Sequence, residues 1–151
     1  MTTINSYLTF NGNCREAMTF YKECLGGQLI LQTVAESPVS DQMPEQMKEC
    51  ILHSMLTSGN ITIMGSDMAP QTLVKGNAVS LMLNFSSEEE TRKVYANLSK
   101  NGDASQPLEI MFWGALFGHL TDKFGNQWMF NFDANQNHNE TKSLIETTQT
   151  F

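Results

Sequence analysis

The stretch HSMLTSGNITIMGSD, residues 53–67, recurs in altered form near the end of the chain, where residues 119–133 read HLTDKFGNQWMFNFD. A shift of 66 positions (119 − 53) aligns four pairs of identical residues, which are His53 with His119, Gly59 with Gly125, Asn60 with Asn126, and Asp67 with Asp133. Similarity at a fixed spacing indicates a duplicated structural unit. The sequence therefore predicts two copies of one module.

The first copy begins with a predicted strand in INSYLTF, residues 4–10, where apolar and polar side chains alternate. Asn13 with Glu16 three residues later resembles a capping box and predicts the start of a helix. The apolar face of this helix has helical spacing and consists of Ala17, Phe20, Tyr21 and Cys24. We expect the helix to end at Gly26-Gly27, followed by strands at 28–34, 50–57 and 61–66. Two prolines indicate a surface loop before the second of these strands, with one helical turn near Gln46.

The second copy repeats this order. A strand is expected at 78–85, and Ser86 or Ser87 would cap a helix whose first turn carries three glutamates. Its buried face is predicted to lie 74 positions after the first (91 − 17), at Thr91, Val94, Tyr95 and Leu98. Strands are then expected at 105–111, 114–121 and 127–132.

These elements predict an α+β fold built from tandem βαβββ modules. The modules span about 4–67 and 77–133, and we expect them to form a single domain at 1–133. Each sheet would be covered by its helix on the outside and would leave a concave inner face. Residues 134–151 are polar and rich in threonine, which indicates an exposed C-terminal tail.

The charge balance limits the classes of partner. Nine basic residues stand against 16 acidic ones, giving a net charge of −7. This disfavours nucleic acid, since its phosphates are bound by lysine and arginine, and it mildly favours cationic small molecules. No apolar run approaches the roughly 18 residues of a membrane span, and the N-terminus lacks a signal-peptide pattern. Three cysteines without a CxxC pair favour a reduced, cytoplasmic compartment.

Two segments resemble a known family. YLTFNGNCREAMTFYKECLGG at 7–27 and FWGALFGHLTDKFGNQWMFNF at 112–132 are similar to the PhnB-like group of the vicinal oxygen chelate superfamily. That superfamily includes glyoxalase I, extradiol dioxygenases, and bleomycin- and fosfomycin-resistance proteins. The resemblance covers about residues 4–133. It implies that the modules form an open, cup-shaped barrel in a homodimer.

The resemblance also implies where metal-using members place their ligands, on the first and last strand of each module. The corresponding positions of this chain are occupied by Ser6, Ile63 or Met64, Ala78, and Met129. A divalent ion needs imidazole nitrogens or carboxylate oxygens directed at one point. We therefore expect no metal and no cofactor. Some PhnB-like proteins are called 3-demethylubiquinone methyltransferases, but this sequence has no glycine-rich loop of the kind that holds an adenosyl cofactor.

The candidate site residues follow from the expected cup. His53 and His119 occupy matching places and are candidates for acid–base catalysis, because the ordinary pKa of imidazole is near neutrality. They are equally compatible with an inert role within their strands. The ligand-binding residues predicted to line the cup are Ser6, Met64, Ser80, Trp113 and Met129.

Aromatic residues add a second signal. Phe112, Trp113, Phe117 and Trp128 surround a predicted hairpin and suit a planar or cationic organic ligand, a hydrophobic core or a dimer contact. For Trp128 the core is the favoured interpretation. Glu109 lies in an apolar neighbourhood, where it either pairs with a cationic ligand or faces outward on its strand.

Three functional hypotheses remain. The leading one is a metal-free protein that binds a small organic molecule in its cup, as resistance proteins do when they sequester a drug. The alternative is an enzyme that uses the two histidines or an atypical metal site. The third is an interaction module whose acidic surface and tail recognise a partner.

Overall fold

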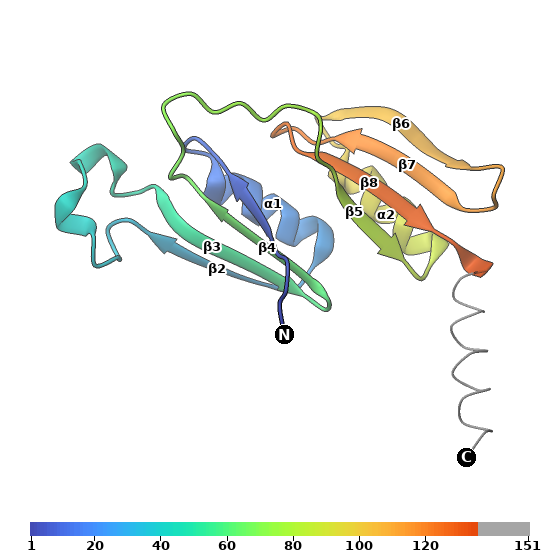
Figure 1. The fold of residues 1–151 in the computed structure, drawn as a ribbon, viewed down its shortest axis with the longest axis horizontal. Helices are drawn as coiled ribbons and strands as arrows, with labels where there is room; N and C mark the ends of the chain where they lie inside the picture. The colour runs from blue at the N-terminus through green and yellow to red at the C-terminus, as the bar shows by residue number, and fades with distance from the viewer. Residues whose placement is uncertain (136–151) are drawn as a thin grey trace, which may run out of the picture. The chain divides into compact units, whose positions relative to one another are not determined.

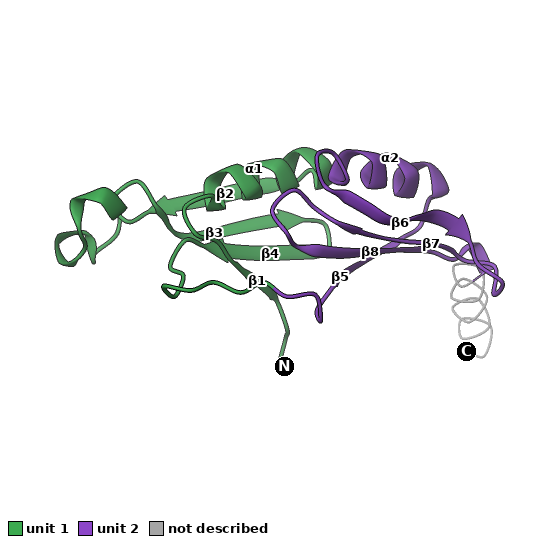
Figure 2. Ribbon diagram, turned by 90° about the horizontal axis from the view of Figure 1, so that it is seen from above, with its two compact units in different colours: residues 1–75 green, residues 76–151 purple. Residues whose placement is uncertain are grey.

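The computed structural model describes residues 1–135 (Figure 1). The chain forms two compact units, and the boundary between them lies between Lys75 and Gly76 (Figure 2). This division falls within the segment that joins the two predicted modules. The single domain expected at 1–133 stays a prediction. The predicted tail, apart from its first two residues, lies outside the described part of the chain.

The first unit contains one βαβββ module. Its elements are β1 (Ser6–Thr9), α1 (Cys14–Leu25), β2 (Gln28–Thr33), the 3-10 turns η1 (Ser40–Gln42) and η2 (Glu45–Met47), β3 (Ile51–Ser58) and β4 (Ile61–Ser66). The strands lie in the order β1-β4-β3-β2, with β1 parallel to β4 and the other pairs antiparallel. Helix α1 covers one face of this sheet (Figure 2).

The second unit repeats the topology. Its elements are β5 (Leu81–Phe85), α2 (Glu88–Leu98), β6 (Asp103–Ile110), β7 (Leu116–Thr121) and β8 (Gln127–Phe132). The order is β5-β8-β7-β6, with β5 parallel to β8. The predicted α+β class and tandem βαβββ modules are thus confirmed, and η2 lies where a helical turn was expected.

Several strands are shorter than predicted, since β1 spans Ser6–Thr9 and not 4–10, and β7 spans Leu116–Thr121 and not 114–121. The sequence indicated a strand over 78–85, but β5 begins at Leu81, which pairs with Trp128. In this register residues 78 and 79 would lie opposite 125 and 126, which belong to the β7–β8 turn and not to β8. Val79 is accordingly exposed.

The two cores lie between each helix and its sheet. In the first unit Ile63 and Leu56 are buried on the helix side, and in the second unit Trp128, Phe130 and Leu120 are. Side chains alternate between the two faces along each strand. Burying each large apolar side chain contributes roughly 1.5–3 kcal/mol, so these layers hold the sheets in place.

The buried face of α1 differs from the prediction. Cys14, Ala17, Met18 and Tyr21 are buried, whereas the predicted Phe20 and Cys24 are only half-buried. The predicted face of α2, with Thr91, Val94, Tyr95 and Leu98, is confirmed. The buried faces of the two helices are therefore related by a shift of 77 (91 − 14) and not of 74. The residues of α1 that contact its sheet begin at Cys14, three positions before the predicted Ala17.

The helix caps also differ between copies. Asn13 is the N-cap residue of α1, but its side chain makes no capping hydrogen bond. The carboxylate of Asp67 instead accepts hydrogen bonds from the backbone N–H groups of Gly12 and Cys14. In α2 the predicted serine cap is confirmed at Ser87, whose hydroxyl accepts from Glu90 N.

The shift of 66, which aligned residues 53–67 with 119–133, does not describe the strand pairing. Two residues separate β3 from β4, while 122–126 separate β7 from β8, so no single shift fits both strand pairs. An added Cβ at Gly27 would clash with the backbone oxygen of Thr57, and one at Gly102 would clash with that of Thr121. Gly27 and Gly102 each follow the helix of their module, so the strand residues that they contact are equivalent. Thr57 of β3 therefore corresponds to Thr121 of β7, which is a shift of 64 (121 − 57).

With this shift, His119 corresponds to Met55 rather than to His53, and His53 corresponds to Phe117 (117 − 53 = 64). The expectation that the two histidines occupy matching places is therefore corrected. Both still lie on the central strands of their sheets. The physical reason is that the β7–β8 turn is longer than the β3–β4 turn. Aligning the glycine and asparagine of the two turns therefore puts residues of β3 and β7 that are not structurally equivalent opposite one another.

Candidate functional site

Each sheet has one face covered by its helix and one opposite face, which we call the helix-free face. In the second unit two rows of paired side chains cross this face. The first row consists of Met82, Met129, His119 and Gln106. The second row consists of Asn84, Asn131, Phe117 and Glu109.

His119 lies in the middle of the first row and is held from both sides. Its Nδ1 lies 3.1 Å from Ser105 Oγ, and its Nε2 lies 3.4 Å from Ser80 Oγ. A hydroxyl can donate or accept, so the neutral imidazole and the imidazolium can each keep both partners. This arrangement orients the ring and allows it to change protonation without losing a hydrogen bond.

Two methionines extend the row on one side of this histidine. Met129 is half-buried and is the register partner of His119, while Met82 is 50% exposed and is the register partner of Met129 on the next strand. Flexible thioethers adapt to irregular apolar shapes. The first row therefore combines two flexible thioethers with an oriented imidazole and, at its other end, the amide of Gln106.

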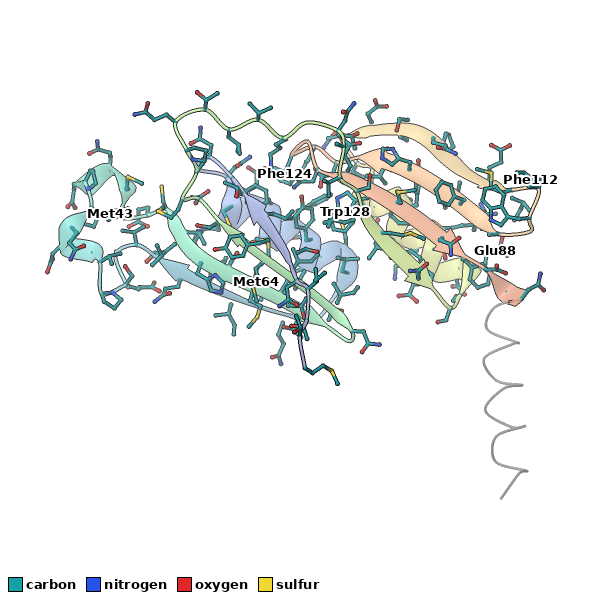
Figure 3. The ribbon with its side chains drawn as sticks, viewed as in Figure 1. Met43, Met64, Glu88, Phe112, Phe124 and Trp128 are labelled. Carbon is teal, nitrogen blue, oxygen red and sulfur yellow. The ribbon has the colours of Figure 1, made fainter. Side chains whose placement is uncertain are left out.

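Trp113 and Trp128 have different roles. Trp128 is buried on the helix side, and its Nε1 donates to Asp122 Oδ2 at 2.8 Å (Figure 3). Asp122 also accepts from Phe124 N and Asn126 N, which fixes the β7–β8 turn. The core interpretation of Trp128 is thus confirmed. Trp113 is half exposed and packs edge-on against Phe117 of the second row.

The helix-free face of the first unit has related chemistry. Its central row consists of Tyr7, Met64, Met55 and Ile30. The Tyr7 ring stacks on His53 with centroids 6.0 Å apart, and its hydroxyl lies 3.5 Å from His53 Nδ1. His53 therefore lies beside the row and not within it.

Ser6 does not share this face with Met64. It pairs with Ile63, which is buried on the helix side, so Tyr7 occupies the corresponding helix-free position. Side chains alternate between the two faces of a strand, so Ser6 lies on the same face as the buried Phe10, which is the helix side. The sequence did not predict Ser105 as a site residue. Its contact with His119 depends on the irregular register between β6 and β7, which has no signal in the local sequence.

Cys14 and Cys50 are poor nucleophiles. Burial raises the pKa of the Cys14 thiol to about 11, with a smaller raising effect of the Asp67 charge and a lowering effect of the Ser54 hydrogen bond. Burial also raises the pKa of Cys50, again with a contribution from Asp67. Both thiols are therefore protonated at neutral pH, whereas a reactive cysteine needs the thiolate.

The residues on the helix-free faces do not fit a divalent metal ion. Within residues 1–135, no group of three or more histidine, cysteine, aspartate or glutamate side chains is arranged to hold one. The first and last strands of the two modules place Tyr7, Met64, Met82 and Met129 on these faces. A phenol and thioethers are unsuited to hard or borderline divalent ions.

In the part of the chain that the structure describes, neither α1 nor α2 has the length and apolar character needed to cross a bilayer.

Comparison with known proteins places the chain in a family. The model of the family described as 3-demethylubiquinone-9 3-methyltransferase matches residues 2–131. Protein YjdN of Escherichia coli K12 is 32% identical over 137 residues, covering 85% of this chain and 93% of that protein.

Solved structures agree. Protein PA1353 from Pseudomonas aeruginosa is 36% identical with a TM-score of 0.78, covering 88% of this chain and 98% of that one. A glyoxalase-related enzyme from Fulvimarina pelagi is 15% identical with a TM-score of 0.60, covering 88% and 89%, and shows the shared fold. The chain therefore belongs to the PhnB-like family, described as 3-demethylubiquinone-9 3-methyltransferase, and it shares its fold with glyoxalase-related proteins.

Proposed function

We propose that this protein binds a small organic molecule on the helix-free face of its second unit, without a metal ion. The observation that carries the proposal is His119, oriented by two serine hydroxyls in a row of methionines. Small-molecule sites combine apolar side chains with a few placed polar groups, and this row combines two methionines with His119 and its two serine partners.

The proposed contact residues are Ser80, His119, Met129 and Trp113, joined by Met82. In the first unit, Met64, His53 and Tyr7 form the corresponding surface, and Tyr7 replaces the expected Ser6 because of its register. The first row lacks a thiolate or a second acid–base group beside His119. This composition favours holding a ligand over transforming it, as in sequestration of a toxic compound by a cytoplasmic homodimer.

A thermal-shift screen with divalent metals, thiol conjugates and cationic antibiotics tests this proposal. A ligand that binds only the folded state raises the melting temperature, by an amount that grows with its concentration over Kd. We expect at least one organic compound to stabilise the wild type, and to stabilise a His119→Ala variant less. Stoichiometric zinc, nickel, iron or manganese in the purified protein would contradict the metal-free part.

The alternative is acid–base catalysis, which the paired hydroxyls of His119 specifically favour. A histidine that keeps its partners in both protonation states can pass a proton without rearranging its surroundings. Loss of a turnover in both His53→Ala and His119→Ala, with unchanged circular dichroism, would support this alternative. Turnover retained in both variants would exclude it.

A further inference from the structure

The second row of the second unit carries chemistry that the first row lacks. It runs from the amides of Asn84 and Asn131 to the ring of Phe117 and the carboxylate of Glu109. Asn131 Nδ2 donates to Asn84 Oδ1 at 3.1 Å, which ties the two amides together. The row thus presents an aromatic ring between a pair of amides and a negative charge.

A second aromatic layer stands at the end of this row. Trp113 packs against Phe117 with ring centroids 6.4 Å apart and planes at 65°. Phe112, at the tip of the β6–β7 hairpin (Figure 3), meets Trp113 at 4.7 Å and 90°. Phe112 is 98% exposed and Trp113 is 51% exposed. Exposed aromatic clusters of this kind mark interaction sites, since isolated monomers rarely leave them uncovered.

The carboxylate of Glu109 has no cationic partner among residues 1–135. Arg92 forms its salt bridge with Glu88, and both residues lie on α2. The other described basic residues of this unit lie on α2, just after it, or in the β7–β8 turn, at Lys93, Lys100 and Lys123. The β7–β8 turn is at the opposite end of β7 from Phe117, so no lysine or arginine of this unit lies on the strands that carry the second row.

Together these groups match one class of ligand. Aromatic rings attract cations through their quadrupole, and an adjacent carboxylate adds a charge-assisted hydrogen bond to an N–H donor. The amide oxygens accept further hydrogen bonds. A net charge of −7 also attracts cations from solution.

We propose that this corner, formed by Glu109, Phe117, Trp113 and the two asparagines, selects organic cations that carry an amidinium or guanidinium group on a planar apolar body. The inference rests on the proposed function and names the class of ligand for the same face. The planar body lies against the rings, while the charged group reaches Glu109.

Benzamidine and benzamide test the inference, because they share a ring and nearly the same shape and differ in charge. Binding is followed by the ¹H–¹⁵N signal of the Trp113 indole, which a Trp113→Phe variant assigns against Trp128. We expect benzamidine to bind about threefold to tenfold more tightly than benzamide. Glu109→Gln, which removes the charge at constant size, should abolish this preference. Glu89→Gln, which removes the same charge from α2, should retain it.

Equal affinity of the two probes for the wild type would overturn the inference and leave the proposed function standing. Equal losses in Glu109→Gln and Glu89→Gln would also overturn it, because the preference would then reflect net charge alone. If neither probe moves the Trp113 signal, the inference fails. The proposed function has a separate test, which is NMR of the Met82 and Met129 methyl groups during titration with a fragment library.

Discussion

The carboxylate of Asp67 lies 2.9 Å from the backbone nitrogen of Cys14, although 53 residues separate them. The same oxygen accepts from Gly12 N at 2.9 Å, and the other oxygen accepts from Ile51 N at 2.8 Å. Asp67 is only 7% exposed. One buried carboxylate therefore joins the N-terminus of α1, where the helix dipole favours a negative charge, to the start of β3.

Replacing this carboxylate should destabilise the protein strongly. In Asp67→Ala three backbone N–H groups lose their acceptor, and we expect the free energy of unfolding to fall by about 3 kcal/mol. Asp133→Ala is the matched control, since the Asp133 side chain accepts from Asn135 N at an exposed position. Its loss should stay below about 1 kcal/mol. Urea denaturation of both variants measures the difference, and equal losses would contradict this role of Asp67.

The cap of α1 shows what the sequence can predict and what it cannot. Local spacing placed the N-cap of α1 at Asn13, the cap of α2 at Ser86 or Ser87, and the succession of strands and helices along the chain, because these depend on neighbouring residues. The acceptor for α1 comes from the end of β4, and no local pattern contains that information. The face of Ser6 and the offset of His53 from His119 were likewise decided by strand register and turn length.

A second prediction concerns Gly27, which adopts a left-handed φ of +88°. An added Cβ would clash with the backbone oxygen of Thr57 and lie 2.7 Å from Ser58 Cβ. We expect Gly27→Ala to cost about 3 kcal/mol or more, since both backbone strain and overpacking oppose it. Gly59→Ala is the control, because Gly59 also has a positive φ of +57° but nothing lies within 4 Å of its added Cβ.

The cost at Gly59 should be about 1–2 kcal/mol, from backbone strain alone. Thermal denaturation followed by circular dichroism compares the two variants. A larger loss in Gly59→Ala than in Gly27→Ala would contradict the packing of Gly27 against β3.

A third prediction follows from the buried thiol of Cys14. Its pKa is raised by burial from 9.0 to about 11. Below about pH 9 the folded and unfolded states both hold the proton. Between pH 9 and 11 the unfolded thiol ionises while the folded thiol does not, so the free energy of unfolding falls as pH rises, by up to about 1.4 kcal/mol per pH unit.

Denaturation curves at pH 8, 9, 10 and 11, recorded with a reductant, test this linkage. We expect Cys14→Ala to lose this part of the pH dependence and Cys24→Ala to retain it, because Cys14 is still present there. An unchanged pH dependence in Cys14→Ala would contradict the assignment.

The central claim is that the helix-free face of the second unit binds a small organic molecule. The most direct test is NMR of the ten methionine methyl groups during titration with a library of aromatic and cationic fragments. The Met82 and Met129 signals, assigned through Met→Leu variants, should shift with at least one fragment, while the signal of Met18, which is buried on the sheet-facing side of α1, should not. A library that leaves Met129 unmoved, or that moves Met18 instead, would contradict the claim.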